Sequence, residues 1–316
     1  MRTVSIVIPN YNGKHFLEDC LKTVFAQNIK DQEVIVVDNG STDGSLEYLH
    51  NFPGVRVIAL DKNYGFCRAV NEGIKAAESD YVILLNNDTE VEPDFTSELL
   101  RAIQKDEKIF SCSSKMIQLH HRELMDDAGD YYCALGWAFG RGKGKSVEKY
   151  NEPADVFAAC AGAAIYRKKM LESLGYFDEK HFAYLEDIDI GYRARIHGYR
   201  NVYAPKAVVY HVGSGFSGSA HNAFKVKLSS RNNVYLIYKN MPFLQIVINS
   251  PFLLMGFLVK WLFFHKKGLG KEYVSGLKEG IRLCREGKKE KYFWKNLSNY
   301  LKIQWELWVN MIRRLI

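Results

Sequence analysis

Three polar residues follow a buried apolar run near the start of the chain. The run at 81–85 (YVILL) is rich in strand formers and stops abruptly at Asn86, Asn87 and Asp88. Such runs are typical of parallel strands buried on both faces, and ligands bind at the carboxyl ends of these strands. A carboxylate beside two amides suits Mg²⁺ or Mn²⁺ carrying a diphosphate. The alternative is that Asp88 and Thr89 only cap the following helix.

A second group of carboxylates begins a predicted helix. The pattern turns helical at Glu186 and stops at Gly198, which places Asp187 and Asp189 in the first turn. The helix dipole favours ionised carboxylates there, and an ionised carboxylate could remove a proton from an acceptor hydroxyl. Asp189 stands four residues before Arg193, so we expect this pair to form a structural ion pair.

A histidine ends another predicted strand. Residues 201–210 have a strand-like pattern that delivers His211 immediately before the glycine-rich stretch 213–218. A lone histidine is usually structural. A neutral imidazole at a strand end beside a flexible loop is nevertheless a reasonable metal ligand.

The elements that position these residues alternate along the chain. Strands predicted at 3–8, 33–37, 55–60 and 81–85 are separated by helices, and this order implies a parallel sheet with helices on both faces. Polar clusters end the first, second and fourth strands, so we expect them to line one edge of the sheet. The sequence has no GxGxxG after the first strand and no GxxxxGK[ST], which argues against a dinucleotide dehydrogenase and a P-loop enzyme.

Four residues in these turns could hold a nucleotide. Asp38 is placed to accept a hydrogen bond from the imide N–H of uracil or thymine. Asn63 and Gly65 would let the backbone approach a phosphate, with Arg68 one helical turn further on. Ordinary turn chemistry is the alternative for each of them. Residues 119–152 are polar, glycine-rich and basic, and we interpret them as a mobile loop or lid, or as a solvated basic loop.

Composition describes a globular chain of 316 residues with an uneven charge distribution. The first residues lack the long apolar segment of a signal peptide, and six scattered cysteines predict reduced thiols in a cytosolic protein. From Lys260 onward, fourteen Lys and Arg face five Asp and Glu, whereas the preceding residues are near neutral. The basic C-terminal region predicts an acidic partner, either a membrane or a nucleic acid.

The C-terminal region carries a membrane-like pattern. Residues 242–259 contain no charged side chain, but polar residues and Pro251 interrupt them, so we favour a re-entrant or interfacial segment over a true span or a buried core helix. The last residues form a basic amphipathic pattern that suits an anionic membrane better than DNA, with oligomer packing as the alternative use. Its expected apolar face consists of Trp294, Leu297, Leu301, Trp305 and Trp308.

Six ordered motifs resemble inverting glycosyltransferases of family 2, and more narrowly the bacterial rhamnosyltransferase-type members that build surface polysaccharides. They are VSIVIPNYN, VIVVDNGSTDGS, NYGFCRAVNEGI, YVILLNNDTEV, GYFDEKHFAYLEDIDIGYRARIHGY and VYHVGSGFSG, and they span about residues 3–240. The resemblance implies a GT-A fold with a mostly parallel sheet, a dTDP- or UDP-sugar donor and a divalent metal, Mg²⁺ or Mn²⁺. We expect a nucleotide half at about 1–117, an acceptor half at about 118–240, and a helical membrane-associated region at 241–316 outside the active site.

The resemblance also assigns roles to individual residues. Asp88 would be the surviving carboxylate of the Asp-x-Asp metal motif, and His211 a second metal ligand or a diphosphate contact. Asp187 would be the catalytic base, with Glu186 as the next candidate. The nucleotide-sugar site would be lined by Pro9, Tyr11, Asp38, Asn63, Gly65, Arg68, Asn86 and Asn87. Asn86 stands where the fuller motif has Asp, so either metal binding is weaker or Asn86 contacts the sugar.

The predicted function is the inverting transfer of a sugar, with rhamnose as a candidate, to a hydroxyl of a lipid-linked saccharide at the cytoplasmic face of the membrane. Two alternatives use the same fold. One is a non-catalytic nucleotide- or glycan-binding module. The other is a sugar nucleotidyltransferase, although those enzymes usually have a glycine-rich basic loop after the first strand where this chain has NYNG.

Overall fold

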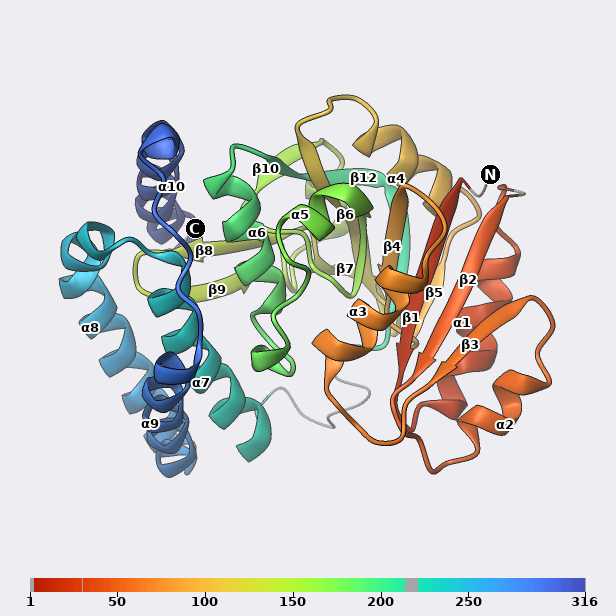
Figure 1. Ribbon diagram of the computed structural model, residues 1–316, viewed down its shortest axis with the longest axis horizontal. Helices are drawn as coiled ribbons and strands as arrows, with labels where there is room; N and C mark the ends of the chain where they lie inside the picture. Colours follow the sequence, from red (N-terminus) through yellow and green to blue (C-terminus); the bar gives the residue numbers. More distant parts are fainter. Residues whose placement is uncertain (1–2, 30, 214–220, 316) are drawn as a thin grey trace.

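A mixed sheet runs through the protein, and helices pack against both of its faces (Figure 1). The computed structural model describes residues 3–29, 31–213 and 221–315. One half of the sheet is parallel, with strand order β3-β2-β1-β4. Its strands are β1 (Val4–Asn10), β2 (Gln32–Asp38), β3 (Val55–Ala59) and β4 (Tyr81–Leu85). The predicted succession of parallel strands is confirmed, and their carboxyl ends meet at one edge.

The other half of the sheet mixes parallel and antiparallel strands. It continues from β4 in the order β11-β6-β12-β10, with β5 added to β12 and β7 added to β6. These strands are β5 (Thr89–Val91), β6 (Ile109–Gln118), β7 (His121–Asp127), β10 (Ala154–Val156), β11 (Ala163–Arg167) and β12 (Arg200–His211). Because β5 pairs with the end of β12, Thr89 lies opposite His211 and the ends of β4 and β12 are brought together.

Alternate residues of the parallel strands enter two different cores. Ile6 and Ile8 of β1 pack with helices on one face, whereas Val7 packs with helices on the other. The first face is covered by α1 (Lys14–Phe25), α2 (Ser45–His50) and α4 (Phe95–Ile103). The second is covered by α3 (Phe66–Ala76), α5 (Lys168–Ser173) and α6 (Glu186–Ile196). Burial on both faces explains why these strands are continuously apolar.

The stretch at 119–152 is not the predicted loop. It contains all of β7 and a two-stranded sheet of β8 (Asp130–Cys133) and β9 (Trp137–Gly140), followed by a short 3₁₀ turn at Val147–Lys149. Gly129 and Gly136 adopt positive φ in the turns that flank β8, a conformation that glycine adopts readily. Tyr132 is fully buried and donates a hydrogen bond to Asn233 over 3.0 Å. The glycines of this stretch therefore lie in turns between short strands, and not in a long irregular loop.

The C-terminal helices lie together at one end of the molecule, at the left of Figure 1. They are α7 (Ala223–Asn240), α8 (Phe243–Lys266), α9 (Gly270–Glu286) and α10 (Leu297–Leu315), with a 3₁₀ turn at Trp294–Asn296 before α10. Leu253, Ile303 and Leu307 from α8 and α10 join Tyr132 and Tyr192 in a third hydrophobic core. The inner faces of these helices are therefore part of the folded body, whereas the sequence predicts a separate region.

Helix α8 has the amide side chains of Gln245 and Asn249 on the inside. Gln245 accepts a hydrogen bond from the hydroxyl of Tyr192, and Asn249 bonds with Gln304 at 2.8 and 2.9 Å. Leu254 on the outer face is 71% exposed. This helix is long and apolar enough to cross a membrane, and only 17% of its most apolar window is buried, which does not fit a buried core helix.

One residue of the expected outer face of α10 points inward. Trp294, Leu301 and Trp305 are exposed as the pattern predicts. Trp308 instead packs against the third core and donates a hydrogen bond to Asn249 over 3.1 Å. The reason is that a tryptophan at the boundary of a helix face can use its N–H on a buried acceptor.

Candidate active site

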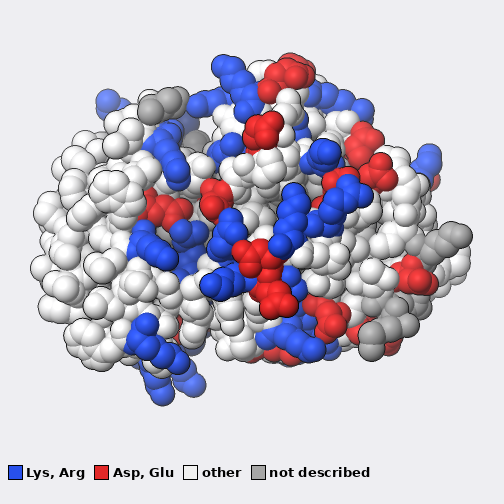
Figure 2. Space-filling view, turned by 90° about the horizontal axis from the view of Figure 1, so that it is seen from above, with Lys and Arg blue, Asp and Glu red and all other residues white. Residues whose placement is uncertain are grey.

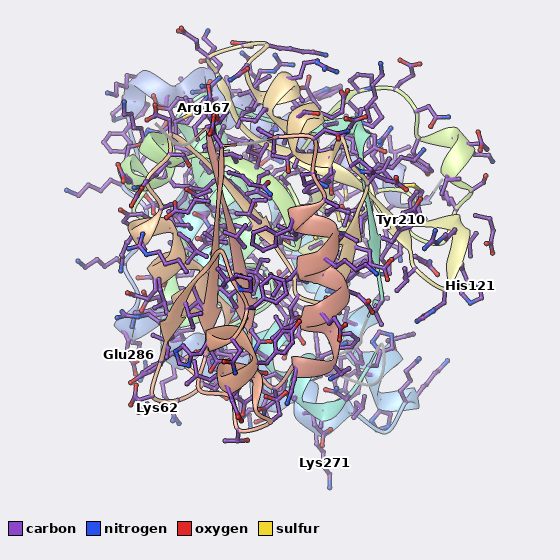
Figure 3. All side chains as sticks on the ribbon, turned by 90° about the vertical axis from the view of Figure 1, so that its right-hand side faces the viewer. Lys62, His121, Arg167, Tyr210, Lys271 and Glu286 are labelled. Carbon is purple, nitrogen blue, oxygen red and sulfur yellow. The ribbon has the colours of Figure 1, made fainter. Side chains whose placement is uncertain are left out.

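The polar ends of β1, β2 and β4 form one hydrogen-bonded network. The Asn10 amide donates to Asp38 over 2.9 Å, and the Asn87 amide donates to Asn10 over 2.7 Å. Asp38 also accepts the backbone N–H of Ser41 at 3.0 Å. Figure 3 shows the two ends of the sheet, with Lys62 beyond the carboxyl end of β3 and Arg167 at the opposite edge. The predicted gathering of polar residues at one edge is confirmed.

The residues expected to hold the nucleotide surround this network. Pro9 is the penultimate residue of β1, and Tyr11 begins the turn that follows. Asp38 is buried and its carboxylate already accepts two protein hydrogen bonds, so it holds the turns together whether or not it also accepts one from a base. Asn63 accepts hydrogen bonds from the Asn39 amide at 3.1 Å and from the N–H of Gly65 at 2.8 Å. These side chains fix the shape of the loops.

Two predicted phosphate contacts are engaged with the protein itself. Gly65 has a φ of +87°, and a Cβ there would meet the Phe182 ring at 2.5 Å, so its missing side chain admits Phe182. Arg68 forms ion pairs with Glu179 at 3.2 Å and Glu72 at 3.1 Å. If either residue contacts a phosphate, it must do so in addition to these protein contacts or after breaking them. The structure gives both residues a role in joining α3 to the segment before α6.

A histidine lies between two carboxylates at the ends of β4, β7 and β12. His211 Nε2 is 3.3 Å from Asp88 Oδ1, and His211 Nδ1 is 2.7 Å from Asp126 Oδ2. Burial alone would lower the pKa of His211, but the hydrogen bonds and charges of Asp126 and Asp88 raise it to about 9. The sequence predicts a neutral imidazole; without a cation the structure instead favours an imidazolium. The exposed Lys143 ammonium lies 3.0 Å from Asp126 Oδ1.

The donor atoms of this group fit a small divalent cation. Carboxylate oxygen and imidazole nitrogen are ligands that Mn²⁺ accepts, and carboxylate and amide oxygens suit Mg²⁺. A cation bound here would replace a proton of the His211 imidazolium. The same residues can therefore hold either a proton or a divalent cation. Asn86 lies beside Asp88; its N–H donates to Gly162 and its carbonyl accepts from Thr89. The predicted pair of Asp88 and His211 is thus brought together by the fold.

Another group of possible ligands lies nearby. Asp127, Asp130 and Cys160 place one ligand atom each within 4.8 Å of one another. A thiolate is a softer ligand than Mg²⁺ prefers, and burial raises the pKa of the Cys160 thiol well above its ordinary value. Burial also raises the pKa of Asp127 to about 7. Because one of these three ligands is a sulfur, the carboxylate oxygen and imidazole nitrogen of Asp88 and His211 fit the predicted metals better.

The predicted base is supported by a second carboxyl group. Burial and the neighbouring charges of Asp127 and Asp187 raise the pKa of Asp130 well above its ordinary value, and the two side chains of Asp130 and Asp187 share a hydrogen bond. Burial also raises the pKa of Asp187, while the Ile188 N–H at 2.7 Å and the Asp130 hydrogen bond oppose this rise. The arrangement is a protonated Asp130 that donates to an ionised Asp187.

Glu186 differs from its neighbour in protonation. Its side chain is 8% exposed, and Oε2 has no hydrogen-bond partner within the part of the chain that the structure describes. Burial, followed by the charge of Asp187, raises the pKa of Glu186 to about 8. It is therefore mostly neutral at pH 7. Asp189 on the same helix forms the predicted buried ion pair with Arg193 at 2.7 Å, and Lys239 joins it at 2.9 Å.

A strained turn aims the start of α6. Phe182, Tyr184 and Leu185 all have positive φ, between 63° and 71°, which is uncommon for residues with side chains. The amide of Asn232 in α7 donates to the carbonyls of His181, Ala183 and Tyr184, each at 2.8 Å. Backbone strain of this kind is found at functional sites where the surroundings hold it in place.

The sequence-based prediction missed the acidic end of β7. Asp126, Asp127 and Asp130 connect the two predicted clusters, because Asp126 contacts His211 and Asp130 contacts Asp187. The signal was present as three acids within five residues (DDAGD) in an otherwise basic stretch. The loop interpretation of 119–152 covers these acids. Residues 214–220, which carry most of the predicted glycine-rich stretch, lie outside the described residues.

Comparison with known proteins identifies the family. Residues 5–175 match the family model of glycosyl transferase family 2, and the chain belongs to this family.

Two curated relatives are polymer synthases. The poly-beta-1,6-N-acetyl-D-glucosamine synthase of Staphylococcus epidermidis is 22% identical over 213 residues, which cover 66% of this chain and 49% of that protein. The synthase of the same name from Staphylococcus aureus is 23% identical, with the same coverage. The chain spans about half the length of these curated relatives.

Solved structures share the fold. GalNAc-T7, solved with UDP, GalNAc and Mn²⁺, has a TM-score of 0.61 at 19% identity over 75% of this chain and 48% of that one. The mannosyltransferase PcManGT of Pyrobaculum calidifontis, solved with GDP-Man and Mn²⁺, has a TM-score of 0.53 at 16% identity over 90% and 85%. TarS 1-349 of S. aureus has a TM-score of 0.52 at 17% identity over 89% and 91%. The predicted GT-A fold is confirmed.

Proposed function

We propose that the protein transfers a sugar, with inversion, from a nucleotide-diphosphate sugar to a hydroxyl group of a saccharide acceptor. One observation carries the proposal: a chain of polar contacts leads from Asp88 at the end of β4, through His211 to Asp126, and the neighbouring Asp130 contacts Asp187 at the start of α6. The predicted leaving-group site and the predicted base are thus parts of one constellation.

Asp187 is the proposed general base. It stays ionised because Asp130 carries the proton between them, and its raised pKa makes it a stronger base than an exposed aspartate. It would take the proton of the acceptor hydroxyl as that oxygen attacks the anomeric carbon from the face opposite the diphosphate. Glu186 is mostly protonated at pH 7, so it is a poorer base there. A single base suffices for inversion, since no covalent sugar intermediate is needed.

Asp88 and His211 are the proposed metal ligands, with Asn86 and Asn87 placed to contact the diphosphate or the sugar. Mg²⁺ or Mn²⁺ bound there would neutralise the charge that develops on the leaving diphosphate. GalNAc-T7 and PcManGT were both solved with Mn²⁺, and this likeness of fold supports the choice of metal. The exposed Lys143 beside Asp126 adds positive charge at the same place.

The donor sugar has two candidates. The motif resemblance points to rhamnose carried on dTDP, whereas the curated relatives are synthases of an N-acetylglucosamine polymer, which points to UDP-N-acetylglucosamine. The acceptor is proposed to be a saccharide linked to a lipid at the cytoplasmic face of the membrane. The apolar outer face of α8 and the basic C-terminal region support this location.

The deciding experiment is a donor screen with the full-length protein. Each nucleotide sugar would be incubated with Mn²⁺ and a lipid-linked acceptor mimic, and both the released nucleoside diphosphate and the glycosylated product would be measured. We expect product from one donor, with inverted anomeric configuration. Nucleotide binding without product from any donor would favour the non-catalytic module. Production of pyrophosphate from a sugar phosphate and a nucleoside triphosphate would show a nucleotidyltransferase.

A further inference from the structure

An apolar groove of about 560 Å³ opens between the start of α8 and the start of α10. Phe243, Leu244 and Ile248 of α8 form one wall, and Trp294, Leu297 and Leu301 form the other. Trp294 is 78% exposed, and Tyr292 stacks on Tyr300 with ring centroids 4.8 Å apart. The lining is almost entirely hydrocarbon and aromatic. The groove is not part of the constellation at the sheet edge.

We propose that this groove binds one hydrocarbon chain of an anionic membrane phospholipid, and that it anchors the protein in one orientation. The proposal rests on the proposed membrane association and adds a specific site to it. The groove continues into the apolar outer face of α8, because Ile248 lines it and the exposed Leu254 and Leu258 lie further along the same helix. Figure 2 shows this end of the molecule, at the left, as a broad surface with few charged side chains.

The charges beside the groove select an anionic headgroup. Lys288, Lys289, Lys291 and Lys295 lie in the segment between α9 and α10, where Glu290 is the only acid between the first and last of them. Lys289 and Glu290 both line the groove, and the Lys289 ammonium lies 5.6 Å from the Tyr238 ring. A phosphate here would meet the Lys289 ammonium at an apolar channel, with three further lysines in the same segment of the chain. A second copy of this chain would bring a basic segment of its own, which makes it a less favourable occupant.

The geometry of α6 separates this lipid from the acceptor. Asp187 and Asp189 are two residues apart on a helix of 3.6 residues per turn, so their side chains point in roughly opposite directions. Asp189 accepts a hydrogen bond at 2.8 Å from Asn240, which lines the groove. The groove is thus on the side of α6 that faces away from the proposed base. A lipid bound in it serves as an anchor, and the acceptor must approach from the other side.

The test measures lipid retention by native mass spectrometry of the full-length protein in detergent. The probes are dilauroyl phosphatidylglycerol and dilauroyl phosphatidylcholine. We expect one retained phosphatidylglycerol per chain, preferred over phosphatidylcholine by about fivefold, which corresponds to one basic contact of ~1 kcal/mol. Ile248→Trp fills the groove without adding polarity and should abolish retention. Leu254→Trp makes a similar change outside the groove and should retain the lipid like the unaltered protein.

A second pair of variants tests the headgroup. Lys289→Glu should lose the preference for phosphatidylglycerol, whereas Lys302→Glu, exposed on α10, should keep it. Failure to retain any lipid, equal retention by Ile248→Trp, no preference between the two lipids, or a lipid-free dimer that buries the groove would each overturn the proposal. Lipid retention is measured without a nucleotide sugar. Its result therefore does not depend on whether the proposed transferase activity is correct. Sedimentation with vesicles reports general membrane association separately.

Discussion

Replacing Glu186 by glutamine should make the protein more stable at alkaline pH. In the folded protein, burial and the charge of Asp187 raise the pKa of Glu186 from 4.5 to about 8. Between these two values the folded chain holds a proton that the unfolded chain has released. The free energy of unfolding must therefore fall as pH rises through this window. Glutamine is neutral at every pH and removes this contribution.

The size of the effect follows from the pKa shift. One pKa unit corresponds to about 1.36 kcal/mol, so a shift from 4.5 to about 8 sets a ceiling of roughly 5 kcal/mol. Part of this shift comes from the charge of Asp187, which protonation or a bound cation relieves. We therefore expect the stability of Glu186→Gln relative to the unaltered protein to increase by on the order of 3 kcal/mol between pH 5 and pH 8.5.

Urea unfolding followed by tryptophan fluorescence at several pH values measures this difference. Any cost of placing an amide in the pocket lowers the free energy of unfolding by the same amount at every pH. The informative quantity is therefore how the difference in free energy of unfolding between the variant and the unaltered protein changes with pH. Glu107→Gln, at an exposed position, should show no such change. A constant difference between Glu186→Gln and the unaltered protein from pH 5 to 8.5 would mean that Glu186 is ionised in the folded state.

Three further predictions follow from the contacts. Asp88→Ala should abolish Mn²⁺-dependent activity and weaken Mn²⁺ binding measured by calorimetry; full turnover in excess EDTA would contradict the metal assignment. Asn232→Ala removes the hydrogen bonds that its amide donates to three carbonyls of the strained turn, so unfolding should become easier by about 1–3 kcal/mol and kcat should fall, measured by urea unfolding and steady-state kinetics; unchanged kcat would separate this turn from catalysis. A chain ending at Asn240 exposes the third core, and we expect it to aggregate, as light scattering would show. A soluble chain that binds nucleotide would restore the sequence-based view of 241–316 as a separate region.

The sequence predicts the parallel half of the sheet well for a physical reason. Its strands are buried on both faces, so each is a continuous apolar run, and each ends in polar residues that cannot be buried. Tyr81–Leu85 agrees in both bounds. Asp88 and His211 are 123 residues apart in the chain, and only the motif resemblance predicts that they share a site. The pairing of β5 with β12 is the structural reason that they lie together.

The second half of the site was harder to predict because its residues are ordinary in isolation. Asp130 matters only because Asp187 lies beside it, and this contact joins β8 to α6. The arrangement of the C-terminal region 241–316 was hard to predict for a related reason. Gln245 and Asn249 weaken an apolar pattern when they are read along the sequence, yet they face the protein and leave the outer surface of α8 apolar.

The central claim is that Asp187 removes the acceptor proton, and Asp187→Asn tests it most directly. The variant keeps the size of the side chain and should bind the nucleotide sugar with unchanged affinity, measured by calorimetry. Its kcat should fall by ~10²-fold or more, because only proton removal is lost. Glu186→Gln at pH 7 serves as the matched control and should lose much less. Transfer by Asp187→Asn at the rate of the unaltered protein would contradict the account and place the base elsewhere.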